Sequence, residues 1–155
     1  DPEIIRHGAD AFGKQCIVLS TQAKKVEASR AIPSGYEVFI DGARTATGMD
    51  VVEWVQRGEA LGAGEIVVNS IDADGTAAGY ELEITRLVAD NVNVPVIASG
   101  GAGTPEHIAA GLTQGGASAA IISSMLYSPR LDRNYGVKEL KDHLIAAGVP
   151  MRPYR

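Results

Sequence analysis

The sequence predicts an α/β fold of parallel strands, in which four βα units follow a leading helix. Apolar runs of strand length alternate with helix-like segments, and the runs cover residues 16–20, 65–70, 94–98 and 117–122. Glycine is frequent, at 18 residues, while aromatic residues make up only 5% of the chain. This composition is typical of parallel sheets, whose strands are rich in Val and Ile and whose turns need glycine. Because 155 residues suffice to bury one core, we expect a single domain over residues 1–155.

The leading helix is predicted over residues 2–12. Asp1 supplies an N-cap, Pro2 stands in the first helical position, and Gly13 ends the helix. The run from Cys16 to Ser20 has no polar alternation, which predicts a strand buried on both faces. Cys16 is the only cysteine, so no disulfide can form within the chain, and we expect it to be a small core residue.

Residues 24–47 differ in character and are interpreted as an insertion between the first strand and its helix. Tyr36 to Ile40 alternates in polarity, and Asp41 and Gly42 follow as turn residues, which predicts a β-hairpin. The helix of the first unit is then expected over residues 49–61.

The later units are regular, and the four units start near residues 16, 65, 94 and 117. Their remaining helices are predicted over residues 80–90, 105–114 and 136–147. Repeated βα units imply parallel strands joined by right-handed crossovers. Two architectures fit this order: a small open sheet, or half of an eight-stranded barrel, which typically needs about 250 residues.

Composition excludes several classes of function. The net charge of −5, with no basic cluster, argues against a nucleic-acid surface. No apolar run reaches the length of a membrane span, and no signal peptide precedes the first helix, so we expect a cytoplasmic protein with no membrane partner. The chain begins with Asp1 rather than Met, which suggests that it is part of something longer.

The segment from Ser99 to Gly103 is a small-residue turn between a strand and a helix that begins at Thr104 and Pro105. Such a turn offers backbone N–H groups to an anion, and glycine lets the anion approach closely. Many βα turns look alike, so ordinary turn chemistry is the alternative. Two further loops favour a phosphate site, because parallel strands bring loops at their carboxyl ends to one edge. They contain Asp72, Asp74 and Gly75, and then Ser123 and Ser124.

Other chemistries fit poorly. A calcium loop starting at Asp72 needs glycine at its sixth position, where this chain has Ala77. Each aspartate has a plainer interpretation as a loop cap. All three histidines fall on predicted helices, where packing or surface roles are favoured. There is no Walker loop, dinucleotide fingerprint or Ser-His-Asp arrangement, so we expect neither a metal nor a cofactor.

Two motifs, Ser70-Ile-Asp-Ala-Asp-Gly-Thr76 and Ile97-Ala-Ser-Gly-Gly-Ala-Gly103, closely resemble the cyclase subunit of imidazole glycerol phosphate synthase. That family is a TIM barrel of histidine biosynthesis. The resemblance runs over essentially the whole chain, but it covers only the family's fourth helix and its fifth to eighth βα units. It therefore implies half of a (βα)8 barrel, made of four parallel βα units after one helix, with a hairpin inserted after the first strand.

The resemblance also implies roles for particular residues. The family closes an imidazole ring on a phosphorylated ribulosyl substrate, with ammonia supplied by a glutaminase subunit. The resemblance implies that Asn69 and Ser99 face the substrate and that Glu65 lies in the ammonia gate. It also implies a phosphate site at Asp74, Gly75, Gly101, Ala102, Gly103, Ser123 and Ser124.

One departure bears on catalysis. The family's Asp-Ala-Lys pattern is Gln22-Ala23-Lys24 in this chain, and glutamine cannot exchange a proton near neutral pH. The second family aspartate belongs to the half that this chain does not match, so the chain alone is expected to be inactive. A half-barrel has two open strand edges, which predicts a homodimer that closes a full barrel. The alternative function is a non-catalytic, even engineered, phosphate-binding half-barrel that self-assembles.

Overall fold

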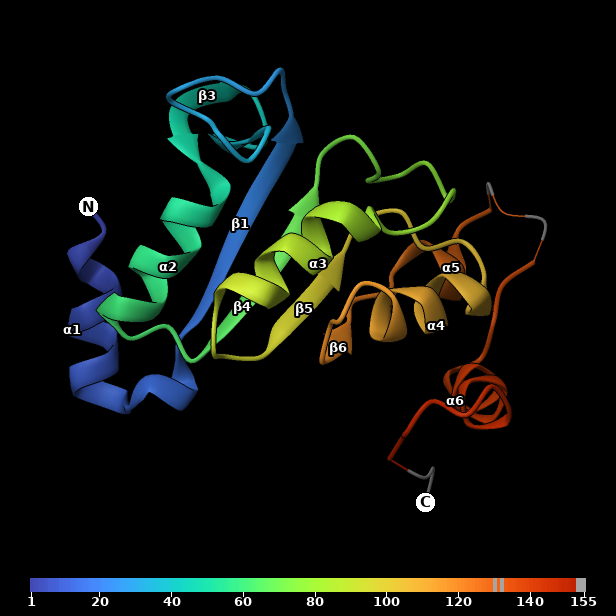
Figure 1. The fold of residues 1–155 in the computed structure, drawn as a ribbon. Helices are drawn as coiled ribbons and strands as arrows, with labels where there is room; N and C mark the ends of the chain where they lie inside the picture. Colours follow the sequence, from blue (N-terminus) through green and yellow to red (C-terminus); the bar gives the residue numbers. More distant parts are fainter. Residues whose placement is uncertain (130, 132, 153–155) are drawn as a thin grey trace.

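The computed structural model describes residues 1–129, 131 and 133–152, and its strands form one six-stranded sheet in the order β3-β2-β1-β4-β5-β6 (Figure 1). Neighbouring strands of the set β1 (Val18–Lys25), β4 (Glu65–Ser70), β5 (Val96–Ser99) and β6 (Ala119–Ala120) are parallel. Each of these four lies beside the next one in the chain, which is the order found in half of a (βα)8 barrel. The predicted fold class is confirmed.

The remaining strands, β2 (Tyr36–Ile40) and β3 (Thr45–Asp50), form the predicted antiparallel hairpin. The hairpin pairs only with the last part of β1, from Gln22 to Lys25. No strand lies beside the outer edge of residues 18–21 in the part of the chain that the structure describes.

The main helices are α1 (Glu3–Phe12), α2 (Val51–Leu61), α3 (Leu82–Asn91), α4 (Pro105–Thr113) and α6 (Val137–Ala146). Helices α2 and α3 lie over one face of the sheet (Figure 1). Local chemistry explains their ends: α1 stops at Gly13 with φ of 89°, and Asp50 caps α2 by accepting the Val52 N–H at 2.8 Å. No helix among the described residues has the length and apolarity that a bilayer crossing requires.

The core lies between the helices and the covered face of the sheet. One cluster joins β4 to α2 and α3, and its centre consists of fully buried Val55, Ile66, Ile84 and Val88. A second cluster joins β5 to α4 and α6 around Ala98, Ile108, Met125, Leu140 and Leu144. The two clusters hold the carboxyl ends of β4, β5 and β6 in place, where the three predicted loops begin.

The other face of the sheet is open. Along β1, burial alternates: Leu19 and Thr21 are buried under the helices, whereas Val18 and Ser20 are exposed. The prediction that this strand is buried on both faces is therefore wrong. Val18 is 48% exposed, because no described segment covers the face that would line the interior of a closed barrel.

Several boundaries differ from the predicted ones. Cys16 is exposed and lies in a short 3-10 turn, η1 (Lys14–Cys16), so its predicted place in the core is wrong. Strand β1 starts later than predicted and continues to Lys25, which places Gln22 and Lys24 in the sheet. Strand β6 has only two residues, and an unpredicted one-turn helix, α5 (Ser124–Tyr127), follows it.

Candidate functional site

Three loops meet at the carboxyl ends of β4, β5 and β6 and enclose a hollow of about 70 Å³. The sheet brings them together because its parallel strands end at a common edge. The hollow contacts six of the seven residues predicted for phosphate. These six are Asp74, Gly75, Gly101, Ala102, Ser123 and Ser124.

The loops after β4 and β5 contact each other directly through backbone. Gly79 N–H donates a hydrogen bond to the Gly101 carbonyl at 2.8 Å. Gly101 has φ of 104°, and a Cβ atom on it would lie 2.1 Å from the Gly79 carbonyl oxygen. Only glycine therefore fits at this position, which explains one of the glycines in the motif by backbone packing.

The hollow offers backbone donors to a ligand. No described residue accepts a hydrogen bond from the backbone N–H groups of Gly75, Gly101 or Ala102. Asp74 is the only charged side chain among the lining residues. Attraction for an anion would therefore come from backbone dipoles rather than from lysine or arginine.

Gly103 differs from the other six predicted residues. It does not line the hollow, and its N–H donates to Nδ1 of His107 at 3.2 Å. His107 is the third residue of α4, so its ring reaches back over the start of its own helix. The acceptor ring thus serves the residue before the helix N-cap, while the Thr104 side chain makes no capping bond, so no capping motif in the sequence signals this contact.

The serines at the third loop are also engaged. Ser123 Oγ and the Tyr127 hydroxyl lie 2.6 Å apart and share a hydrogen bond. Ser124 begins α5, which directs the start of this short helix toward the other two loops. Asp72 lies outside the hollow, because its Oδ2 accepts the Lys25 N–H at 2.9 Å and so ties β1 to the loop after β4.

A row of polar side chains crosses the open face next to the hollow. Gln22 pairs with Asn69, and Asn69 pairs with Ser99, so the three residues share one row on one face. Ser99 Oγ donates to Asn69 Oδ1 at 2.9 Å. Oε1 of Gln22 is buried and has no hydrogen-bond partner among the described residues. The row thus contains a buried acceptor, on Gln22, that no described residue satisfies.

Glu65 lies at the other end of the same sheet face. It is the first residue of β4 and pairs with Val18, four residues before Asn69. At the rise of a β-strand this separates the two Cα atoms by about 13 Å. Glu65 is therefore not part of the hollow.

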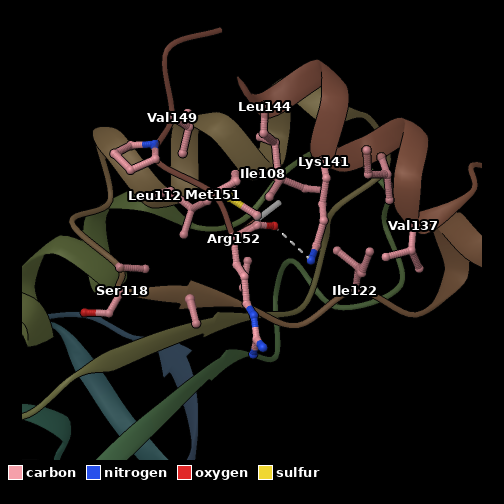
Figure 2. A pocket seen from close by; sticks show the side chains of 15 residues that line it. Ile108, Leu112, Ser118, Ile122, Val137, Lys141, Leu144, Val149, Met151 and Arg152 are labelled. Atoms are coloured by element: carbon pink, nitrogen blue, oxygen red, sulfur yellow. Dashed lines mark hydrogen bonds between the residues drawn. The ribbon is translucent and has the colours of Figure 1, made fainter. Parts of the chain in front are cut away.

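Two larger hollows lie at the open edges of the parallel strands. Figure 2 shows the first, an apolar groove of about 540 Å³ between β6, α4 and α6. Its charged members are Lys141 and Arg152, and Lys141 Nζ donates to the Arg152 carbonyl at 3.2 Å. The second, of about 600 Å³, borders the free edge of β1 and is lined by residues of α1 and β2. The second groove also carries polar side chains, from Asp1, Ser20, Thr21, Gln22 and Asp41. The small hollow differs from both grooves in its glycine turns, which let an anion approach backbone N–H groups, so it is the better anion site.

Comparisons with known proteins give one family. Residues 1–132 match the family model described as "Histidine biosynthesis protein". The chain is 55% identical over 152 residues to "Imidazole glycerol phosphate synthase subunit HisF" of Desulfatibacillum aliphaticivorans, covering 98% of this chain and 57% of that protein. Proteins of the same name from Solidesulfovibrio magneticus and Nitratidesulfovibrio vulgaris are 52% and 53% identical, again over 57% of their length.

Proposed function

The chain belongs to the histidine biosynthesis protein family, and we propose that it forms the phosphate-binding half of an imidazole glycerol phosphate synthase cyclase. The observation that supports this proposal most is the hollow formed by the three loops. Gly75, Gly101 and Ala102 line it, and their backbone N–H groups have no acceptor among the described residues. These are the donors that a phosphate group uses at a βα turn.

The proposed substrate is a phosphorylated sugar whose phosphate occupies this hollow. The rest of the molecule would then lie across the row formed by Gln22, Asn69 and Ser99. The side chain of Gln22, which stands in this row, would hydrogen-bond to the substrate. In this arrangement the chain's own residues bind and orient the substrate, and Gly103 fixes the start of α4 instead of contacting phosphate.

Position 22 of this chain does not supply the proton acceptor that we propose cyclisation needs there. Glutamine at position 22 can hydrogen-bond but cannot act as a general acid or base, a loss that typically costs about 10²- to 10⁴-fold in rate. We therefore propose that the chain alone has no cyclase activity. Turnover with ammonia would need a complementary half-barrel and a carboxylate at position 22.

Binding of the phosphate group is tested by titration calorimetry with glycerol phosphate and with glycerol. The two ligands differ only in the phosphate, so glycerol serves as the matched control. Glycerol phosphate is expected to bind saturably and glycerol not at all. Equal binding of both ligands, or of neither, contradicts the proposal.

Whether the chain is the half of a cyclase is tested by complementation. The Gln22→Asp variant is mixed with the amino-terminal part of a curated relative, and cyclisation is assayed with ammonia. We expect activity from this mixture and about 10²-fold less or lower from the unsubstituted chain. If the mixture with the Gln22→Asp variant binds phosphate but remains inactive, the chain is a non-catalytic phosphate-binding half-barrel.

A second proposal concerns partners, and the exposed apolar side chains favour it. Large exposed apolar side chains among the described residues fall on or next to elements at the two edges of the set of parallel strands. They are Ile4, Phe12, Val18, Ile40, Ile121, Tyr127, Val137 and Ile145. We propose that two copies pair head to tail, so that the β1 edge of each copy covers the β6 edge of the other. This pairing would remove both open edges and fill both grooves.

Light scattering at micromolar concentration tests this pairing. We expect the mass of a dimer, and a well-folded stable monomer would contradict it. In a closed barrel, Glu65 would lie at the end opposite the phosphate, where we propose that ammonia enters from a glutaminase partner. This placement, like a cytoplasmic location, follows from the proposed family role.

A further inference from the structure

Glu81 immediately precedes α3, yet its side chain caps no N–H group of that helix. Its carboxylate instead accepts two hydroxyl hydrogen bonds. The Tyr36 hydroxyl donates to Oε1 at 2.7 Å, and Ser70 Oγ donates to Oε2 at 2.6 Å. Both donors are almost fully buried, with Tyr36 1% and Ser70 2% exposed. A carboxylate is the side chain that can accept from two hydroxyl groups at once without donating.

The bond from Ser70 fixes the direction of its hydroxyl proton. A serine hydroxyl has one proton and two lone pairs, so with the proton on Glu81 the lone pairs are left for an incoming donor. That donor is the Ala73 N–H, at 3.2 Å from Ser70 Oγ. The Asp74 N–H donates to the Ser70 carbonyl at 3.0 Å, so the loop after β4 is anchored twice at Ser70.

Ala73 in turn contacts the glycine loop. A Cβ atom on Gly101 would lie 3.0 Å from the Ala73 carbonyl oxygen, as well as 2.1 Å from that of Gly79. Ala73 and Gly79 together therefore determine how closely the loop after β4 approaches Gly101. These contacts form a continuous path from Tyr36 in the hairpin, through Glu81 and Ser70, to the edge of the hollow.

We infer that Glu81 is a positioning residue for the anion hollow: by holding the Ser70 hydroxyl toward itself, it sets the loop of Asp74 and Gly75 against Gly101. The inference rests on the proposed phosphate function. Tyr36 supports Glu81 from the hairpin side. Burial and the Glu81 carboxylate raise the pKa of the Tyr36 phenol, which keeps it a donor across the physiological range. The hairpin thereby takes part in shaping a site that it does not line.

The test uses Glu81→Gln, which keeps the size of the side chain but leaves only one acceptor oxygen. Asp90→Asn on α3 is the matched control, because Asp90 lies at the surface and pairs only with Arg86 among the described residues. Two quantities are measured: the exchange rate of the Ala73 amide hydrogen, and the dissociation constant for inorganic phosphate. Glu81→Gln is expected to speed Ala73 exchange and to weaken phosphate about tenfold, while Asp90→Asn changes neither. Tyr36→Phe removes one donor and leaves the carboxylate, so a smaller shift in the same direction is expected.

A double substitution separates positioning from general destabilisation. If Glu81 acts through Ser70, then Glu81→Gln in a Ser70→Ala background adds little further loss of phosphate affinity. Glu81→Gln that lowers the melting temperature but leaves Ala73 exchange and phosphate affinity unchanged in the folded protein overturns the inference. If the unsubstituted chain binds no phosphate, the proposed function fails, and the Ala73 exchange rate still decides whether Glu81 positions the loop. Should Glu81→Gln not fold, Tyr36→Phe is read by the same two measurements, and no change in either overturns the inference.

Discussion

At Gly101 the backbone of one loop lies so close to the next that a single methyl group would not fit. The hypothetical Cβ would be 2.1 Å from the Gly79 carbonyl oxygen, and φ is 104°. Two separate requirements for glycine therefore coincide at one residue of the hollow. The loops after β4 and β5 can therefore approach this closely only because residue 101 has no side chain.

Gly101→Ala is expected to push the two loops apart and to weaken phosphate binding by at least about tenfold, because a displaced donor costs about one hydrogen bond. The matched control is Gly42→Ala in the hairpin turn, where φ is also positive, at 64°, but nothing lies within 4 Å of the added Cβ. The control carries the backbone strain without the clash. The phosphate affinities of the two variants are measured by calorimetry. Equal affinities would contradict the steric explanation for glycine at position 101.

Residue patterns predicted the loops well because their chemistry is local. Gly13 and Pro105 mark helix ends through their own backbone angles, and Gly101 and Ser124 reach one hollow because parallel strands end at one edge. Cys16 was placed in the core because it adjoins an apolar run, but η1 turns it outward. The bonds of Glu81 to Tyr36 and Ser70 span 45 and 11 residues, and no local pattern encodes them.

At the scale of elements, the entry into α2 shows how one side chain joins two segments. Asp50 is only 3% exposed, and its Oδ1 accepts the Val52 N–H at 2.8 Å. Its Oδ2 accepts the Ser34 N–H, also at 2.8 Å, from the segment that leads into the hairpin. The residue therefore caps a helix and, at the same time, fixes the segment that leads into the hairpin.

Asp50→Ala is expected to destabilise the protein by about 2 kcal/mol, because it removes an N-cap and leaves a buried N–H without an acceptor. For a chain of this size the melting temperature should fall by about 4–8 °C. Asp90→Ala on α3 is the control, since it loses only a surface ion pair worth less than about 1 kcal/mol. A thermal melt of each variant provides the comparison, and similar melting temperatures would show that Asp50 has no special role.

The bounds of β4, a strand at the centre of the sheet, were predictable from the sequence. Strand β4 lies between β1 and β5, and its predicted and observed bounds agree, from Glu65 to Ser70. Strand β6 pairs on one side only and is reduced to Ala119 and Ala120, although the apolar run is longer. The physical reason is that a strand is maintained by its partners, and no partner beyond β6 is described.

At the scale of the whole molecule, two buried tyrosines link stability to pH. Burial raises the pKa of Tyr80, whose hydroxyl donates to the Ile121 carbonyl at 2.7 Å. Burial and Glu81 raise the pKa of Tyr36 as well. Both shifts start from an ordinary value of 10.0, so the folded state prefers the protonated phenols. This contribution to stability is complete below pH about 10 and is lost progressively as the pH rises above that value.

We therefore expect alkaline unfolding in which Tyr36 and Tyr80 ionise together with the loss of structure. Tyrosinate absorbance and circular dichroism are followed in parallel as the pH rises. The last part of the absorbance change should coincide with the loss of the dichroism signal. Complete ionisation of all the tyrosines in a protein that keeps its native spectrum would contradict the pKa shifts.

The open face and the open edges give the molecule its overall character. Val18 on β1 and Ile121 after β6 are 48% and 45% exposed. Exposed apolar side chains of this kind are typical of an interaction surface. The fold class followed from the repeated βα pattern, but the uncovered face did not, because burial depends on what lies opposite. The carboxyl edge of the strands nevertheless brings three loops around one hollow, where we propose that phosphate binds.

Phosphate binding at the three loops is tested by titrating the protein with inorganic phosphate and following the amide proton and nitrogen chemical shifts of each residue. Saturable shifts are expected at Gly75, Gly101 and Ala102, with Gly42 in the hairpin turn unaffected. Shifts confined to the groove between α4 and α6, or no saturable shift at the three loops, would contradict it.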